Sequence, residues 1–366
     1  MLTPSTKEVT EVSHIRPVLK FLSATLAVTV LAACGGGEQV STDPNAKVTL
    51  TFTAYGGAGQ DAMIKVYQKP YTATHPNVTF VNSSPPDLSQ VKAQVLSKSV
   101  KWDLVSVAPA AATQNCGKLF EELDLSGVDA KDLVPGTIGK CYIGNFINAN
   151  PIAYRTDAFP DPGKAPKTVA DFFDLKKFPG KRGLLTNIQN GILEYPLLAD
   201  GVPASSLYPL DLDRSLKKLD TIRDQTLFAP NVGALQQAVG AKQVDMFILP
   251  DSRLVPLMND GAKLTILWDQ TVAAINGFAI PKGSPHKAAA QEFIKTLASP
   301  EAAAGMQEAL GTAPVNKAAK PNLSENAKKV EVYGPVNTGQ TVLQDVDWYA
   351  ANFDQANTKL SNWLVG

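Results

Sequence analysis

The sequence has few of the residues that most enzymes use for catalysis or metal binding. Its 366 residues include three His and three Cys, and only His75 and His286 follow residue 33. No His-Glu-x-x-His or Gly-x-Ser-x-Gly motif occurs. Neither histidine has an acid and a nucleophile near it in the sequence, so we expect both at the surface. The sequence therefore predicts a protein that is not an enzyme and that holds no metal and no cofactor.

The chain also lacks a strong net charge and a long apolar run. Residues 1–33 hold three of the 34 Lys and Arg residues and two of the 34 Asp and Glu residues, so the remaining chain carries about −1. That balance gives no support to nucleic-acid binding. The apolar stretch Phe21–Ala33 has 13 residues, whereas a membrane-spanning helix needs about 20. We expect no membrane span.

What is present at the start is a targeting segment. Three basic residues precede the uncharged stretch Phe21–Ala33, which ends in small residues and so predicts a signal peptide over residues 1–33. Leu31–Cys34 resembles a bacterial lipobox, which predicts a lipid on Cys34; an ordinary signal peptide followed by a chance cysteine is the alternative. Residues 34–46 are rich in Gly and polar residues and predict a flexible tether. The protein is thus expected to be exported, to the periplasm or the cell surface, with a lipid as its only membrane attachment.

Two cysteines remain, Cys116 and Cys141. A single pair in an exported protein favours a disulfide, with two buried thiols as the alternative. Neither has a Cys or His close by in the sequence to complete four metal ligands.

Beyond the tether, strand and helix patterns alternate. Val48, Leu50 and Phe52 alternate with threonines, and a glycine-rich loop and a helical segment follow. This alternation predicts an α/β protein with parallel strands covered by helices. Predicted strands are Val78–Val81, Leu104–Val107, Tyr142–Ile147, Ile152–Tyr154, Val244–Leu249, Leu264–Leu267 and Gly277–Pro281; predicted helices include Leu88–Ser97, Val169–Asp174, Gly191–Asp200, Leu212–Asp224, Lys287–Ala298 and Glu301–Leu310, and the aromatic spacing of Gln340–Leu364 is helical.

The glycine loop after the first strand, Gly57–Ala62, formally fits the relaxed dinucleotide fingerprint. That motif also needs an acid about 20 residues further on, and Asn77–Val81 has none. We interpret the loop as a tight turn that brings the backbone close to a ligand.

Several segments together resemble the solute-binding proteins of ATP-driven importers, in particular the family that includes the spermidine/putrescine receptors. The resemblance covers most of the chain after residue 46, and its strongest pieces are Lys101–Val105, Phe178–Gly183, Leu193–Val202, Phe278–Gly283 and Trp348–Ala350.

The resemblance implies a two-lobe periplasmic-binding-protein-like fold (type II) with the ligand cleft between the lobes. Lobe 1 is expected to comprise residues 47–147 and 278–330, lobe 2 residues 148–277, and a helical tail residues 331–366. Crossing strands are expected near Asn145–Ile152 and Asn276–Phe278. The resemblance also implies a monomer that delivers its solute to ABC permease subunits, and it includes a cysteine pair like that of a polyamine-receptor-like subgroup.

The same resemblance supplies the candidate ligand-binding residues. Glu194 is the expected partner of a ligand amine, because a cationic ligand needs carboxylates and aromatic faces. Two motifs differ from the polyamine pattern: Pro250–Arg253 replaces an aromatic-Asn-Gly-Arg run, and Ala274–Asn276 replaces Trp-x-Asp. The expected cleft residues are Tyr55, Gly56, Ala108, Tyr142, Asn145, Asn190, Glu194, Asp251, Arg253, Trp268 and Asn276.

The predicted function is capture of a polyamine such as spermidine or putrescine. The alternative is another small solute, amino-acid-like or an organic anion, for which Arg253 would be the leading contact. A ferric-ion receptor would want adjacent tyrosines, and the sequence has no Tyr-Tyr pair. Two alternatives belong to other functional classes: an exported enzyme, and a surface lipoprotein that takes no part in transport.

Overall fold

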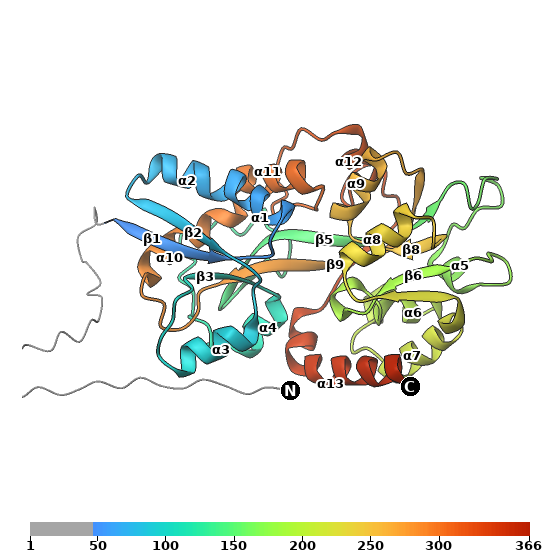
Figure 1. The fold of residues 1–366 in the computed structure, drawn as a ribbon, viewed down its shortest axis with the longest axis horizontal. Coiled ribbons are helices and arrows are strands. Elements are labelled where there is room, and N and C mark those ends of the chain that lie inside the picture. The colour runs from blue at the N-terminus through green and yellow to red at the C-terminus, as the bar shows by residue number, and fades with distance from the viewer. Residues whose placement is uncertain (1–46) are drawn as a thin grey trace, which may run out of the picture. The chain divides into compact units, whose positions relative to one another are not determined.

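The computed structural model describes residues 47–366, so the predictions for the signal peptide, Cys34 and the tether lie outside the described residues. A single 10-stranded sheet runs through this part of the chain in the order β2-β1-β3-β9-β5-β8-β6-β7, with β10 beside β9 and β4 beside β5 (Figure 1). The strands are β1 (Val48–Thr53), β2 (Val78–Ser83), β3 (Leu104–Val107), β4 (Ile138–Gly139), β5 (Tyr142–Arg155), β6 (Arg182–Leu185), β7 (Thr226–Ala229), β8 (Met246–Ile248), β9 (Leu264–Ala279) and β10 (Gln340–Leu343).

The two longest strands, β5 and β9, join two lobes. They pair antiparallel with each other. β9 also pairs with β3 on one side and β5 with β8 on the other. Lobe 1 is built on β1, β2 and β3, and lobe 2 on β6, β7 and β8. The sequence divided each long strand into two short ones. The division was wrong because the register of β5 shifts at Gly144/Phe146 and Asn150/Ile152, which interrupts the alternation that marks a strand.

Lobe 1 has parallel strands covered by helices on both faces, as the alternation predicted (Figure 1). Phe52 of β1 stacks on Phe278 of β9 with ring centroids 4.6 Å apart, and both rings are fully buried. The helices are α1 (Ala58–Met63), α2 (Lys69–Thr74), α3 (Leu88–Leu96), α4 (Pro109–Gln114), α10 (Lys287–Lys295) and α11 (Pro300–Leu310).

Lobe 2 repeats the parallel arrangement. The sequence did not predict β6 or β7, which have four residues each and little alternation. β6 begins with Arg182, whose buried guanidinium donates hydrogen bonds to the carbonyls of Phe172, Phe178 and Gly180. The helices are α5 (Val169–Phe173), α6 (Glu194–Ala199), α7 (Leu212–Asp220), α8 (Val232–Gly240) and α9 (Asp251–Asn259).

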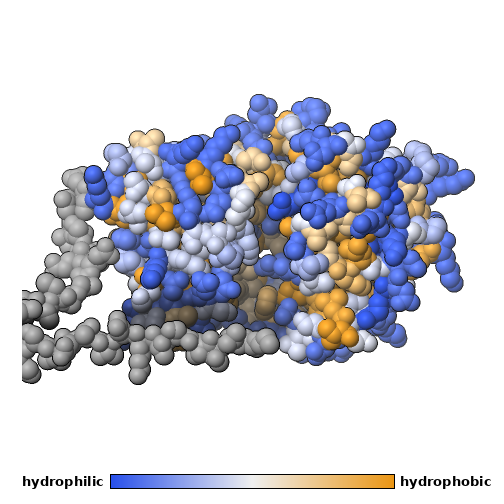
Figure 2. All heavy atoms as spheres, viewed as in Figure 1, coloured by the Kyte–Doolittle hydropathy of each residue, from blue (hydrophilic) through white to orange (hydrophobic). Residues whose placement is uncertain are grey.

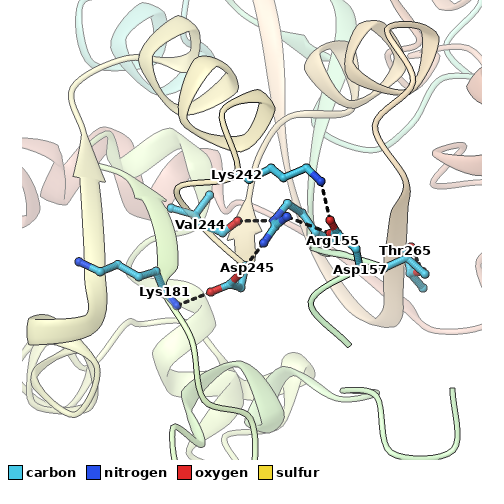
Figure 3. Close-up of polar contacts among 8 residues, drawn as sticks. Arg155, Asp157, Lys181, Lys242, Val244, Asp245 and Thr265 are labelled. Atoms are coloured by element: carbon cyan, nitrogen blue, oxygen red, sulfur yellow. Dashed lines mark hydrogen bonds and ion pairs between the residues drawn. The ribbon is translucent and has the colours of Figure 1, made fainter. Parts of the chain in front are cut away.

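A charged cluster ties together the outer ends of the lobe 2 strands (Figure 3). Arg155, at the end of β5, pairs with Asp245 at 2.7 Å and with Asp157 at 2.9 Å. Asp245 also accepts a hydrogen bond from the Lys181 amide, and Lys242 pairs with Asp157. Asp245 and Lys181 directly precede β8 and β6, so the cluster lies where these strands begin.

The C-terminal segment contributes α12 (Glu325–Lys329), β10 and the long helix α13 (Val346–Val365). The tail is thus helical only from Val346, because residues 340–343 pair with β9. α13 contacts α4 of lobe 1 and α7 of lobe 2. No helix between residues 47 and 366 is long and apolar enough to span a membrane.

The predicted disulfide is confirmed. Cys116, which follows α4, is bonded to Cys141, which precedes β5.

Candidate ligand-binding cleft

The strand directions place a cleft between the lobes. β5 runs from lobe 1 into lobe 2. β3 is antiparallel to β9, which is antiparallel to β5, so the lobe 1 strands point toward lobe 2. β8 is antiparallel to β5 and parallel to β6, so the lobe 2 strands point toward lobe 1. The carboxyl ends of both sets therefore face each other, and ligands of open α/β sheets bind at such ends. Figure 2 shows the surface hollowed between the two lobes.

The inner end of this interlobe cleft is a small cavity of about 40 Å³, here called the inner cavity. That volume holds no more than a few waters, whereas ligand pockets measure about 300–1,000 Å³. The cavity brings together both lobes, β9 and the start of α13. Its lining residues are Ala108, Pro109, Ala110, Ile188, Gln189, Ala274, Ile275, Gln344, Asp345, Val346, Tyr349 and Phe353.

Tyr55, Gly56 and Ala108 follow the ends of β1 and β3. The Tyr55 side chain is 57% exposed, yet the protein atoms around its hydroxyl desolvate it and raise its pKa. Both observations are expected for a side chain that is exposed to solvent within a recess of the surface. A Cβ on Gly56 would lie 3.0 Å from the Ser84 Oγ, so this turn packs closely on the end of β2. Ala108 lines the inner cavity.

Glu194, the expected partner of a ligand amine, makes internal hydrogen bonds, two of them with residues that line the inner cavity. Its side chain is fully buried, and its Oε1 accepts hydrogen bonds from Tyr349 Oη at 2.6 Å, Tyr208 Oη at 2.8 Å and Gln344 Nε2 at 2.8 Å. Burial raises the pKa of Glu194, and this effect exceeds that of the three hydrogen bonds, which lower it. All three donors bond Oε1, and Oε2 has no hydrogen-bond partner among the described residues. The expectation that Glu194 meets a ligand amine stays a prediction.

Asp251 is also a buried internal group. One carboxyl oxygen accepts a hydrogen bond from the Ala149 amide at 3.1 Å, and the other accepts one from the Ser252 amide at 2.7 Å. Burial raises its pKa well above the ordinary value. Asp251 therefore joins α9 to the crossing strand β5, and the expectation that it contacts the ligand stays a prediction.

Three further predicted residues lie at the junction of β5 and β9. The Tyr142 hydroxyl donates to the Gly136 carbonyl at 2.8 Å, and its ring is buried. Asn145 is fully buried and accepts a hydrogen bond from Asn276 Nδ2 at 2.8 Å. Asn276 also donates to Ser106 Oγ at 3.3 Å and stays half-buried. Tyr142 and Asn145 are buried and bonded internally, whereas Asn276 keeps more exposed surface. All three stay predicted contacts of the ligand.

The remaining predicted residues differ in their surroundings. Asn190 is half-buried and donates to Asn150 Oδ1 at 2.7 Å. Trp268 is half-buried against the core of lobe 1 and does not line the inner cavity. Arg253 lies in the first turn of α9, just beyond the carboxyl end of β8. It is half-buried and makes no ion pair or side-chain hydrogen bond with another described residue. Arg253 is thus the one predicted charged residue that no described residue neutralises.

Sequence reasoning missed several residues of the inner cavity. Gln189 follows β6, and Gln344 follows β10, two strands that the sequence did not predict. A prediction of β6 would have placed Gln189 at a strand end, where cleft residues are expected. Within residues 47–366, no group of three or more His, Cys, Asp or Glu side chains is placed to hold a metal ion.

Two α/β lobes, two crossing strands and a cleft between facing strand ends define a solute-binding protein that encloses its ligand between lobes. The chain belongs to the bacterial extracellular solute-binding protein family, whose model matches residues 62–333. Members of this family act outside the cytoplasm as substrate-binding proteins of ABC transporters.

Individual relatives agree with this assignment. The chain is 28% identical over 324 residues to a gamma-aminobutyric acid-binding protein of Pseudomonas aeruginosa, covering 87% of this chain and 91% of the relative. Its structure is similar to the Atu4243 GABA receptor, with 32% identity, a TM-score of 0.79, and 86% and 97% of the two chains covered. It is also similar to AgtB of A. tumefaciens R10 in complex with agropinic acid, with 28% identity, a TM-score of 0.73, and 87% and 99% covered. The polyamine part of the prediction gains no support from these relatives.

Proposed function

We propose that the protein captures a small amino-acid-like solute in the interlobe cleft and delivers it to an ABC permease. The observation that carries the proposal is which of the predicted charged residues already bond to other parts of the protein and which do not. Glu194 and Asp251 are buried and bonded internally, whereas Arg253 lies just beyond the carboxyl end of β8 without a partner among the described residues. A cation at the carboxyl end of β8 favours a ligand that carries a carboxylate.

The relatives support the same chemistry. Gamma-aminobutyric acid and agropinic acid, the compounds that two of these relatives are named for or bind, each carry a carboxylic acid. A polyamine carries only cationic groups, and it would need the exposed carboxylates that Glu194 and Asp251 do not provide. Tyr55, Gly56, Ala108, Tyr142, Asn145, Asn190, Glu194, Asp251, Trp268 and Asn276 remain proposed contacts of the ligand, and Cys34 remains the proposed lipid attachment.

A thermal-shift screen tests this proposal. Gamma-aminobutyrate, proteinogenic amino acids, spermidine and putrescine are compared at equal concentration, because a ligand that binds only the folded state stabilises it by RT ln(1 + [L]/Kd). We expect one or more carboxylate-bearing solutes to raise the melting temperature and the two polyamines to leave it unchanged. Stabilisation by spermidine or putrescine alone would overturn the amino-acid-like assignment and leave the transport role intact.

A further inference from the structure

A larger cavity lies away from the cleft. Its volume is about 560 Å³, within the range of small-molecule pockets. β10 separates it from the inner cavity. Thr341 and Leu343 of β10 line the larger cavity, whereas Gln344, which follows β10 and still pairs with β9 through its amide, lines the inner one. Because successive side chains of a strand point to opposite faces, the two cavities lie on opposite faces of β10. We call the larger one the rear cavity.

The lining of the rear cavity is mostly apolar. Six of its eleven lining residues are Val, Pro, Ala or Leu. Tyr333 adds an aromatic ring that is 46% exposed. Surrounding protein atoms desolvate its hydroxyl and raise its pKa to about 12, as expected for a ring in a recess. An exposed tyrosine beside prolines and Leu343 offers a surface for the apolar body of a ligand.

The rear cavity has few polar groups, and these differ in their exposure and in their hydrogen-bond partners. Lys317 is exposed and forms no ion pair with a carboxylate among the described residues. Glu331 already accepts a hydrogen bond from Gln307 Nε2 at 3.1 Å. Gln307 is buried, and its Oε1 has no hydrogen-bond partner within the described part of the chain. Lys317 is therefore the one cationic residue in the lining of the rear cavity, and no described carboxylate pairs with its ammonium group.

We propose that the rear cavity is a second binding site, which takes a small organic carboxylate with an apolar body and pairs its carboxylate with Lys317. The site shares no lining residue with the inner cavity. It is therefore independent of which solute the interlobe cleft captures.

Titration of the full chain with phenylacetate, followed by ligand-observed NMR and calorimetry, tests the site. We expect saturable binding in the millimolar range or tighter. Neutral phenylacetamide should bind about ten-fold more weakly, because it cannot form a charge-assisted hydrogen bond with an ammonium group. Lys317→Gln should weaken phenylacetate by a similar factor. The matched control is Lys320→Gln, an exposed lysine outside the cavity lining, which should leave binding unchanged.

Two more variants locate the binding. Ala319→Trp fills the rear cavity and should abolish phenylacetate binding. Arg253→Gln changes the cleft and should leave it unchanged, whether or not the cleft takes an amino-acid-like solute. No binding at 10 mM, equal binding of phenylacetamide, or loss of phenylacetate binding in Arg253→Gln would each overturn the proposal. Because Lys317→Gln alters an exposed side chain, a folding failure of Ala319→Trp leaves the test decisive.

Discussion

The Tyr349 hydroxyl donates a hydrogen bond of 2.6 Å to the Glu194 carboxylate and so joins α13 to α6 across 155 residues of sequence. Tyr208 and Gln344 donate to the same oxygen. Tyr349 and Gln344 also line the inner cavity. The buried carboxyl group thus positions the C-terminal helix that closes the inner end of the cleft.

Removing one of these donors should destabilise the fold. Tyr349→Phe keeps the ring but removes a hydrogen bond to a buried carboxyl group, which we expect to cost about 1.5–3 kcal/mol in the free energy of unfolding. Urea denaturation measures it. The control is Tyr333→Phe, whose hydroxyl bonds to no other described residue and whose loss should be nearly neutral. Equal effects of the two changes would contradict a supporting role for the Glu194 network.

Arg253→Gln should weaken binding of the cleft ligand without changing stability. Loss of a charge-assisted pair corresponds to about 1.5–3 kcal/mol, or about 10- to 150-fold in Kd, measured by calorimetry with the best hit of the screen. Arg214→Gln removes an exposed arginine that pairs with Asp200 and serves as the control. Unchanged affinity in Arg253→Gln would show that the ligand carboxylate is held elsewhere.

The buried carboxyl group of Asp251 should make the free energy of unfolding depend on pH. Burial raises its pKa in the folded state, so between the unfolded and folded pKa values the folded state binds more protons. Its contribution to stability is therefore full below about pH 4, the ordinary pKa, and is lost as the pH rises through the folded-state pKa. Asp251→Asn, which carries no charge at any pH, should remove this loss.

Urea midpoints measured from pH 4 to pH 8 compare the wild type with Asp251→Asn. The pKa of Glu194 is also raised, so Glu194 adds to the pH dependence in both proteins. Asp251→Asn should therefore flatten the plot of urea midpoint against pH only in part. Asp213→Asn, on an exposed face of α7, should follow the wild-type profile. Parallel profiles for the wild type and Asp251→Asn would refute the assignment.

The disulfide should contribute to stability through the unfolded state. Cys116 and Cys141 are 25 residues apart, and closing a loop of this size stabilises a protein by roughly 3 kcal/mol on the loop-entropy estimate. The double change to Ser should lower the urea midpoint accordingly. A reductant should destabilise the wild type and leave the double variant unaffected; an equal response of both proteins would exclude this role.

Cys34 is expected to carry the membrane anchor. Cys34→Ala should move the protein from the membrane fraction to the soluble fraction of cells that express the full chain. Detergent phase partitioning of both forms measures this change. A variant that stays as membrane-bound as the parent would refute lipid attachment at this position.

Local patterns in the sequence determined the α/β class. The alternation in Val48–Thr53 and the strand patterns at 78–81 and 104–107 reflect burial of one or both strand faces, which is written in neighbouring residues. The pairing of Cys116 with Cys141 followed from their being the only two cysteines left in an exported chain.

Only the tertiary structure decided which polar side chains remain available to a ligand. Glu194 was placed in the cleft by resemblance, but its donors Tyr208 and Tyr349 lie 14 and 155 residues away. Asp251 meets the amide of Ala149, 102 residues earlier. A carboxylate is exposed or buried according to the groups that fold around it, and no local pattern encodes partners so distant. Arg253 differs from both because no other described side chain approaches it closely enough to pair.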